Sequence, residues 1–172
     1  MMSDLDPYSP IFTQAEACQI AAIEPAWVNN WIARGHFKVV ESADRRLAGR
    51  RLFSPQDIVF LAAMGMAIHD VGMQPADAKQ FAHRAAAEIW YPKRDGFVTM
   101  LIGRRAPATG GSFWQVGFIW LEKATGKMNE PGEVIPDLSK EAFVLMPCSE
   151  IVDAVVERCR AMLSKESDDT DK

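Results

Sequence analysis

The sequence contains few of the residues from which disulfides, metal sites and membrane spans are built. Its three cysteines are odd in number and lack the spacing of a zinc ribbon, which excludes a disulfide framework and a structural zinc module. Its three histidines fall on separate predicted elements, without metal-ligand spacing. No apolar run approaches the roughly 18 residues of a membrane-spanning helix. We therefore expect no metal, no cofactor and no membrane partner.

Signals for export and catalysis are also missing. Residues 1–6 are acidic where a signal peptide would be basic, so a cytoplasmic protein is expected. The segment Gly103–Gly111 is glycine-rich and basic but lacks the Lys-Ser or Lys-Thr end of a phosphate loop, and a hairpin turn is expected there. Cys148, at a predicted helix start, is either a redox-responsive thiol of lowered pKa or a small buried or capping thiol. No catalytic triad can be identified, and we do not expect an enzyme.

Basic charge is concentrated in one segment of an acidic chain. The 172 residues carry a formal net charge of −4, with 48 % apolar and 24 % charged residues, a composition typical of a soluble globular protein. Between Arg34 and Arg51 there are six basic and two acidic residues, whereas residues 96–172 hold nine basic and twelve acidic ones. Such a local basic segment can bind DNA phosphates, while the acidic remainder restrains promiscuous binding.

Two short helices are predicted after an N-terminal arm of residues 1–11. Thr13 and Glu16 have the spacing of a capping box, so the first helix should begin near residue 14. Pro25 suits the first position of a second helix, residues 25–34, and Gly35 provides its left-handed exit.

Strand-like runs at residues 37–41 and 51–53 enclose a polar, arginine-rich loop at residues 42–50, and residues 42–51 are the predicted wing. A third helix should follow the Ser54 cap, with a buried stripe made by Ile58, Leu61, Ala62, Met66 and Ile68. A fourth should begin at Pro75 and bury Ala76, Ala78, Phe81 and Ala85. These four helices and the wing predict a winged helix-turn-helix domain over residues 12–90.

The C-terminal half has a different pattern. Residues 97–102, 112–121 and 142–146 read as strands, and an amphipathic helix with a stripe from Ile151 to Leu163 follows. We predict an α+β protein whose residues 96–165 form a small antiparallel β-sheet covered by one amphipathic helix. The acidic residues 166–172 should form a disordered tail. The strand at 112–121 is apolar on both faces, and one face needs a partner. Four partners stay open: the helix of residues 150–163, the DNA-binding half, a second subunit or a small ligand.

The N-terminal half resembles the MerR-type winged helix-turn-helix DNA-binding domain and the related excisionase-type modules. The resemblance covers residues 12–87 and is carried by Thr13–Ala17, Ile23–Pro25, Trp31 with Arg34–Gly35, Arg51–Asp57 and Gly72–Pro75. It implies that the second helix reads the DNA major groove and that the wing contacts the backbone. The chain departs from the family in three ways. Asn29 and Asn30 stand where an arginine is usual, Phe53 replaces a tyrosine, and no long dimerising helix directly follows the fourth.

The residues expected to contact DNA fall into two groups. Asn29 and Asn30 can pair bidentately with adenine, or they simply solvate the helix surface. Trp27 either covers the sugars of the DNA backbone or packs against the wing. Trp31 is expected in the core. The remaining candidates, expected on phosphates or in the minor groove, are Arg34, Lys38, Arg45, Arg46, Arg50 and Arg51.

The sequence as a whole predicts a transcription regulator that binds double-stranded DNA. A homodimer through the C-terminal domain is expected, because symmetric operators are matched by two-fold dimers, and this domain can also take a small-molecule effector. Two alternatives stay open: a phage or mobile-element accessory protein, excisionase-like or a packaging adaptor, and a protein-interaction adaptor whose winged helix does not bind DNA.

Overall fold

The described chain mixes helices with two small antiparallel sheets, as the α+β prediction requires. The computed structural model describes residues 5–38, 46–47, 50–89, 97–108, 111–122, 128–129 and 143–170. Its helices are α1 (Gln14–Ala21), α2 (Pro25–Ala33), α3 (Pro55–His69), α4 (Pro75–Glu88) and α5 (Cys148–Thr170). Its strands are β1 (Phe12–Thr13), β2 (Arg46–Leu47), β3 (Arg50–Phe53), β4 (Phe97–Ala108), β5 (Gly111–Glu122), β6 (Met128–Asn129) and β7 (Phe143–Met146).

The predicted helix boundaries near the N-terminus are confirmed. Thr13 and Glu16 form the capping box of α1, in which each side chain bonds the other residue's backbone amide. Ser54 and Asp57 form an equivalent capping box at the start of α3. Pro25 opens α2, and Gly35 follows its end with a φ of 71°. Local sequence therefore fixes where these helices begin and end.

A three-stranded sheet with the order β1-β3-β2 joins the hairpin to the start of α1. Phe12 pairs with Phe53, and Arg46 pairs with Arg51. The strand predicted from residue 37 does not begin there: Phe37 and Lys38 lie outside any strand, and residues 39–41 lie outside the described residues. Phe37 is instead a core residue whose ring stacks on Phe53 at 6.1 Å, with an interplanar angle of 11°.

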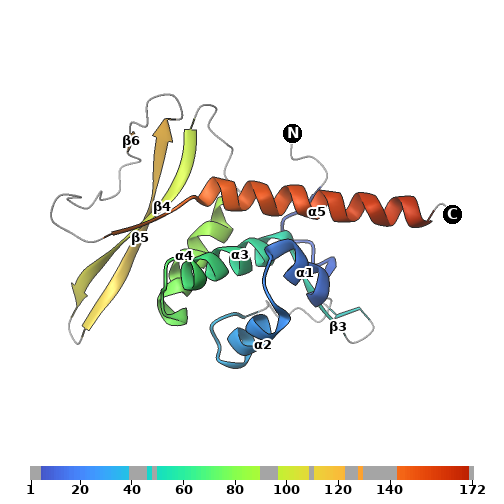
Figure 1. Cartoon of the computed structure of the whole chain (residues 1–172), viewed down its shortest axis with the longest axis horizontal. Coiled ribbons are helices and arrows are strands. Elements are labelled where there is room, and N and C mark those ends of the chain that lie inside the picture. The colour runs from blue at the N-terminus through green and yellow to red at the C-terminus, as the bar shows by residue number, and fades with distance from the viewer. Residues whose placement is uncertain are drawn as a thin grey trace.

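Helix α3 is the centre of the molecule. The stripe predicted for it is wrong in extent, because Val59, Phe60, Ala63 and Met64 outside it are buried, while Ala62, Met66 and Ile68 within it are only half-buried. Helices α1, α4 and α5 all contact α3 (Figure 1). A helix that is apolar all round is a buried helix. On α4 the buried face also differs from the prediction, since Ala76 is exposed and Ala82 and Ala86 are buried.

The second sheet has the order β6-β5-β4-β7 and is dominated by the long hairpin of β4 and β5. The predicted hairpin of these two strands is confirmed, but the loop predicted at Gly103–Gly111 is too long, because β4 continues to Ala108 and β5 begins at Gly111. Gly103 is instead a site of close packing, because a Cβ there would overlap Cζ of Phe81 and lie 2.8 Å from its Cε1. The glycine lets an α4 ring lie directly on the strand.

One face of this sheet packs against helices, and more than one helix covers it. Phe81 of α4 makes an edge-on contact with Trp114 of β5, the ring centroids being 5.5 Å apart. Helix α5 contacts β4, while α4 contacts both β4 and β5. The prediction of a single covering helix is therefore wrong. α4, which the sequence assigned to the N-terminal domain, supplies part of the cover.

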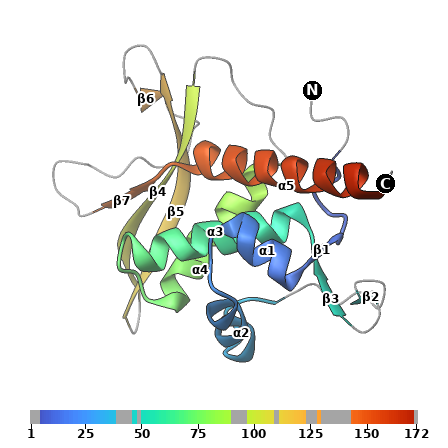
Figure 2. The ribbon, with the colours of Figure 1, turned by 45° about the vertical axis from the view of Figure 1, so that its right-hand side comes forward.

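Helix α5 runs along the side of the body opposite to α2 (Figures 1 and 2). It continues to Thr170, through most of the segment expected to be a disordered tail. Buried residues of α1, α3, α4, β4 and α5 belong to one continuous hydrophobic core, which crosses the boundary predicted between residues 90 and 96. Among the described residues, no helix has both the length and the apolar character needed to cross a bilayer.

Candidate nucleic-acid interface

Helix α2 is anchored through one face and through its C-terminal exit. Val28 and Trp31 are buried, as predicted for Trp31. The carbonyl oxygen of Trp31 accepts hydrogen bonds from the amides of His36 and Phe37, at 2.8 and 3.2 Å. These two bonds satisfy a carbonyl that the helix end would leave open. The orientation of α2 is thus fixed at its buried side, and the opposite side is free to face a partner.

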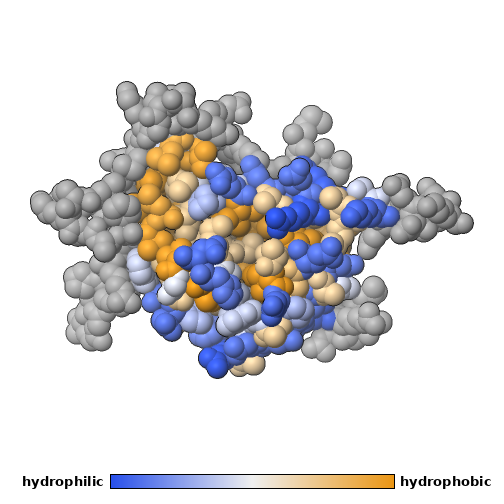
Figure 3. Space-filling view, viewed as in Figure 1, coloured by the Kyte–Doolittle hydropathy of each residue, from blue (hydrophilic) through white to orange (hydrophobic). Residues whose placement is uncertain are grey.

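Several of the predicted DNA-contact residues on or next to α2 are exposed. Trp27 is 38 % exposed, and Asn29 and Arg34 are also exposed, whereas Asn30 is half-buried. Lys38, just beyond the helix, is exposed as well. The space-filling view shows a mainly hydrophilic surface where α2 lies, in contrast to the apolar side chains that gather over β4 and β5 (Figure 3).

Asn29 has a partner that the sequence analysis missed. The side-chain nitrogen Nε2 of Gln14, the first residue of α1, donates to Oδ1 of Asn29 at 2.9 Å. The bond leaves both hydrogens on Nδ2 of Asn29 and the oxygen of Gln14 available. Together the two amides offer donors and an acceptor side by side. The feature of the sequence that could have revealed this bond is a glutamine at the start of a helix that must pack beside α2.

The ring of Trp27 packs against two neighbouring rings. Its ring meets the His69 ring edge-on, with centroids 5.0 Å apart and an interplanar angle of 77°, and lies 6.3 Å from the Trp31 ring. His69 belongs to the last turn of α3. Trp27 therefore packs against the end of α3, whereas the two expectations from the sequence were packing against the wing and contact with DNA sugars. Its exposed part keeps a flat aromatic surface at the start of α2.

The hairpin brings two of the predicted arginines together. In the antiparallel pair of β2 and β3, Arg46 lies directly opposite Arg51, and Arg50 lies opposite Leu47. Like charges at directly opposed positions destabilise a sheet unless an anion or solvent screens them. Arg51 is half-exposed. Arg45, the fourth arginine of the predicted wing, lies outside the described residues, as do most of residues 42–49.

The three cysteines are buried, and burial disfavours the thiolate form through which a cysteine reacts. Burial raises the pKa of Cys18 and of Cys148, and the nearby Glu88 carboxylate raises that of Cys148 further. Burial also raises the pKa of Cys159 to about 12. The possibility of a lowered pKa at Cys148 is therefore wrong: desolvation of the thiolate outweighs the helix dipole. Nor do the described parts of the chain bring three His, Cys, Asp or Glu side chains together as a metal site.

The sequence matches no protein-family profile and no curated protein. The function is therefore inferred from the chain's own residues and their geometry.

Proposed function

We propose that this protein is a DNA-binding transcription regulator with a winged helix-turn-helix module of the MerR type. In this proposal α2 enters the major groove, and the hairpin of β2 and β3, with the predicted wing at residues 42–51, lies on phosphates or in the minor groove. The observation that carries the proposal is the exposure of Trp27, Asn29 and Arg34 on and next to α2, outside the side by which Val28 and Trp31 hold the helix to the core.

The dimensions of α2 suit this role. An α-helix with its side chains is about 10–12 Å in diameter, comparable with the width of about 12 Å of the major groove. The amide pair of Gln14 and Asn29 offers the donor and acceptor groups that adenine recognition requires. Asn29 is therefore the proposed base-reading residue, and Gln14 is a positioning residue that can also contact the DNA.

The distribution of charge supports the same surface. α2 and the hairpin both lie on the side of the molecule away from α5 (Figure 2). The C-terminal segment that includes α5 is the acidic part of the chain, so its charge is directed away from the proposed interface. The opposed positions of Arg46 and Arg51 favour an anion beside the hairpin. A net charge of −4 is therefore compatible with DNA binding at one face.

The test is a pair of double variants with equal change in charge. Arg34→Ala with Lys38→Ala removes two exposed cations from the proposed interface, and Arg160→Ala with Lys165→Ala removes two from the exposed side of α5. Fluorescence anisotropy with labelled duplex DNA over a salt series should show a log–log slope that is less steep by about 0.9 for each phosphate that the variant no longer neutralises. The α5 variant should keep the wild-type slope.

A second variant, with alanine in place of all four arginines of residues 45–51, tests the hairpin in the same assay. We expect it to lose most of its binding to random duplex at low salt. Negligible binding by the wild type, or equal slopes for the two double variants, would contradict the proposal. The first result would favour the interaction-adaptor alternative.

We further propose that the protein forms a homodimer through the sheet face that does not pack against helices. The register places Ile102 opposite Leu145 and Met100 opposite Ile119 on this face. Leu145 is 39 % exposed and Met100 is half-buried, whereas Ile102 and Ile119 are already buried within the single chain. A partner would therefore cover the exposed apolar side chain of Leu145, as apolar interaction sites do. A two-fold dimer would place two α2 helices on a symmetric operator.

A further inference from the structure

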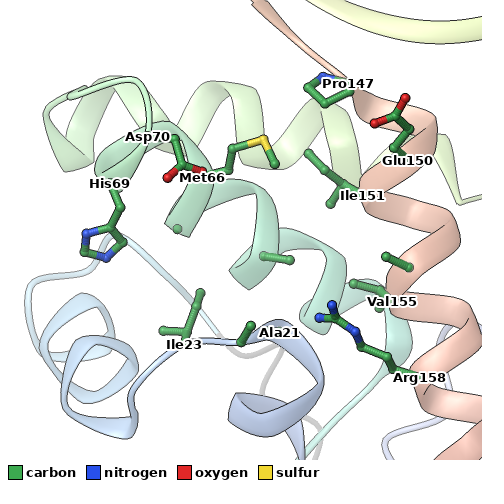
Figure 4. Close-up of a pocket in the computed structure, with 14 residues that line it drawn as sticks. Ala21, Ile23, Met66, His69, Asp70, Pro147, Glu150, Ile151, Val155 and Arg158 are labelled. Atoms are coloured by element: carbon green, nitrogen blue, oxygen red, sulfur yellow. The ribbon is translucent and has the colours of Figure 1, made fainter.

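A groove opens between the turn that joins α1 to α2, the second half of α3 and the first half of α5 (Figure 4). Its volume is about 460 Å³, within the range of small-molecule sites. The floor is apolar, with Ile23, Met66 and Ile151 among its residues. Small residues make the space, notably Gly65, where a Cβ would come within 2.8 Å of Cδ1 of Ile23.

Charged side chains stand at the two ends of this floor. Arg158 lies at the α1 end, where its Nη1 donates to the carbonyl oxygen of Ile20 at 2.9 Å. That bond uses one of five guanidinium donors, and the others remain available. Glu150 lies on the same side of α5, eight residues away, which corresponds to about 12 Å along the helix. Asp70, at the end of α3, lies across the groove from α5, next to Met66.

Among the residues that the structure describes, these three charged groups have no partner of opposite charge. Within the described ranges, Arg158, Glu150 and Asp70 form no ion pair with one another or with any other side chain. Along α5 the groove thus has the Arg158 cation at one end, the Glu150 carboxylate at the other and an apolar floor beside them. A complementary ligand has the reverse order: an anionic group beside Arg158, an apolar body, and a cationic amine beside Glu150.

We propose that this groove binds a small zwitterion with an apolar body, about 10 to 12 Å long, with a carboxylate at one end and an amine at the other. Two sources share this chemistry. A free apolar tripeptide spans about 10 Å when extended, and an ω-amino acid of eight carbons has a similar length.

The position of the groove makes its ligand an effector, a statement that rests on the proposed DNA-binding function. Ala22 and Ile23, which line the groove, form the turn that leads into α2. His69 also lines it, and its ring packs against Trp27 on the proposed DNA-reading helix. A ligand in the groove therefore contacts both the entry of α2 and the support beneath Trp27. Any preference of the ligand for one orientation of α2 appears as a change in DNA affinity.

Isothermal titration calorimetry with the full chain tests binding without reference to DNA. The probes are 8-aminooctanoate and the tripeptide Ala-Leu-Ala with free termini. The controls are octanoate, octylamine and the same tripeptide acetylated and amidated. We expect at least one zwitterion to bind more tightly than its controls, which each lack an end group. Glu150→Gln should weaken that binding by about tenfold, as loss of a hydrogen bond to a charged group does.

A matched pair of substitutions on α5 separates the groove from nonspecific effects. Ala154→Phe fills the groove and should abolish binding, whereas Ala161→Phe, at an exposed position of the same helix, should not alter it. The proposal is overturned if neither zwitterion binds at millimolar concentration. It is equally overturned if the controls bind as well, or if Ala154→Phe binds like the wild type.

Anisotropy with duplex DNA, with and without the bound zwitterion, then tests the effector role. A shift in DNA affinity that Ala154→Phe removes supports it. Ligand binding with unchanged DNA affinity overturns the effector role. A protein that binds the zwitterion but no DNA overturns the proposed function and leaves the ligand site in place, so the two failures are distinguishable.

Discussion

Replacing Gly103 with alanine should destabilise the protein by about 3 kcal/mol, although the change adds one carbon to a strand. The added Cβ would overlap Cζ of Phe81 and lie 2.8 and 3.0 Å from its Cε1 and Cε2 atoms. The ring is fully buried and lies edge-on to Trp114, so it has no free space into which to move. Overpacking costs about 1–3 kcal/mol, and complete loss of a buried phenylalanine costs about 3–5 kcal/mol.

Gly117→Ala is the matched control within the same hairpin. A Cβ there meets nothing within 4 Å. Because the substitution only reduces the freedom of the unfolded chain, it should be neutral or stabilise by up to about 1 kcal/mol. With a urea m-value of about 2 kcal/mol/M, the unfolding midpoints of the two variants should differ by about 1.5 M or more.

Urea unfolding followed by tryptophan fluorescence measures both midpoints. Phe81→Leu in the Gly103→Ala background provides a second check, because a shorter side chain relieves the overlap. The double variant should be less destabilised than the sum of the single changes. Coincident midpoints for the two glycine variants, or strict additivity in the double variant, would refute the assigned role of Gly103.

Three further outcomes follow from the interface, the sheet and the core. Asn29→Ala should lower the affinity for a selected DNA site by about 1–3 kcal/mol and relax the base preference at one position. Binding to a panel of variants of that site measures both effects. An unchanged base preference would show that Asn29 does not read a base. Leu145→Glu should shift the mass measured by sedimentation toward that of the monomer. Ile11→Glu, at another exposed apolar residue, should not. Equal masses for the two variants would argue against the sheet-face dimer. Cys148 and Cys159 should resist a thiol reagent at about pH 8 and react after unfolding, because burial raises both pKa values; rapid reaction of the native protein would be inconsistent with their burial.

Local signals in the sequence identified the N-terminal elements well. The capping boxes at Thr13 and Ser54, the proline that opens α2 and the glycine that follows it each act within a few residues. Such features depend on short-range hydrogen bonds and backbone preferences, so a single sequence contains the necessary information. The α3 stripe was less predictable, because whether its other sides are buried depends on helices far along the chain.

The errors arose where distant segments meet. Gly103 was interpreted as part of a turn, but its purpose depends on Phe81 of another element. The bond from Gln14 to Asn29 and the groove beside Ile23 and Arg158 likewise need the relative placement of helices. A glycine in an apolar run is compatible with a turn or a close approach, and only the tertiary structure distinguishes these.

The bond from Arg158 to the carbonyl oxygen of Ile20 joins residues 138 positions apart in the chain. Around it, α5 packs against α1 and α3, so the first helices share their core with the last one. Contacts of such long sequence separation form slowly, because the whole intervening chain must be closed into a loop first. During synthesis, α1 to α4 must wait on the ribosome for α5 to emerge before their core is complete. The side chains that α5 covers are exposed for that interval, which makes the nascent chain a candidate substrate for chaperones.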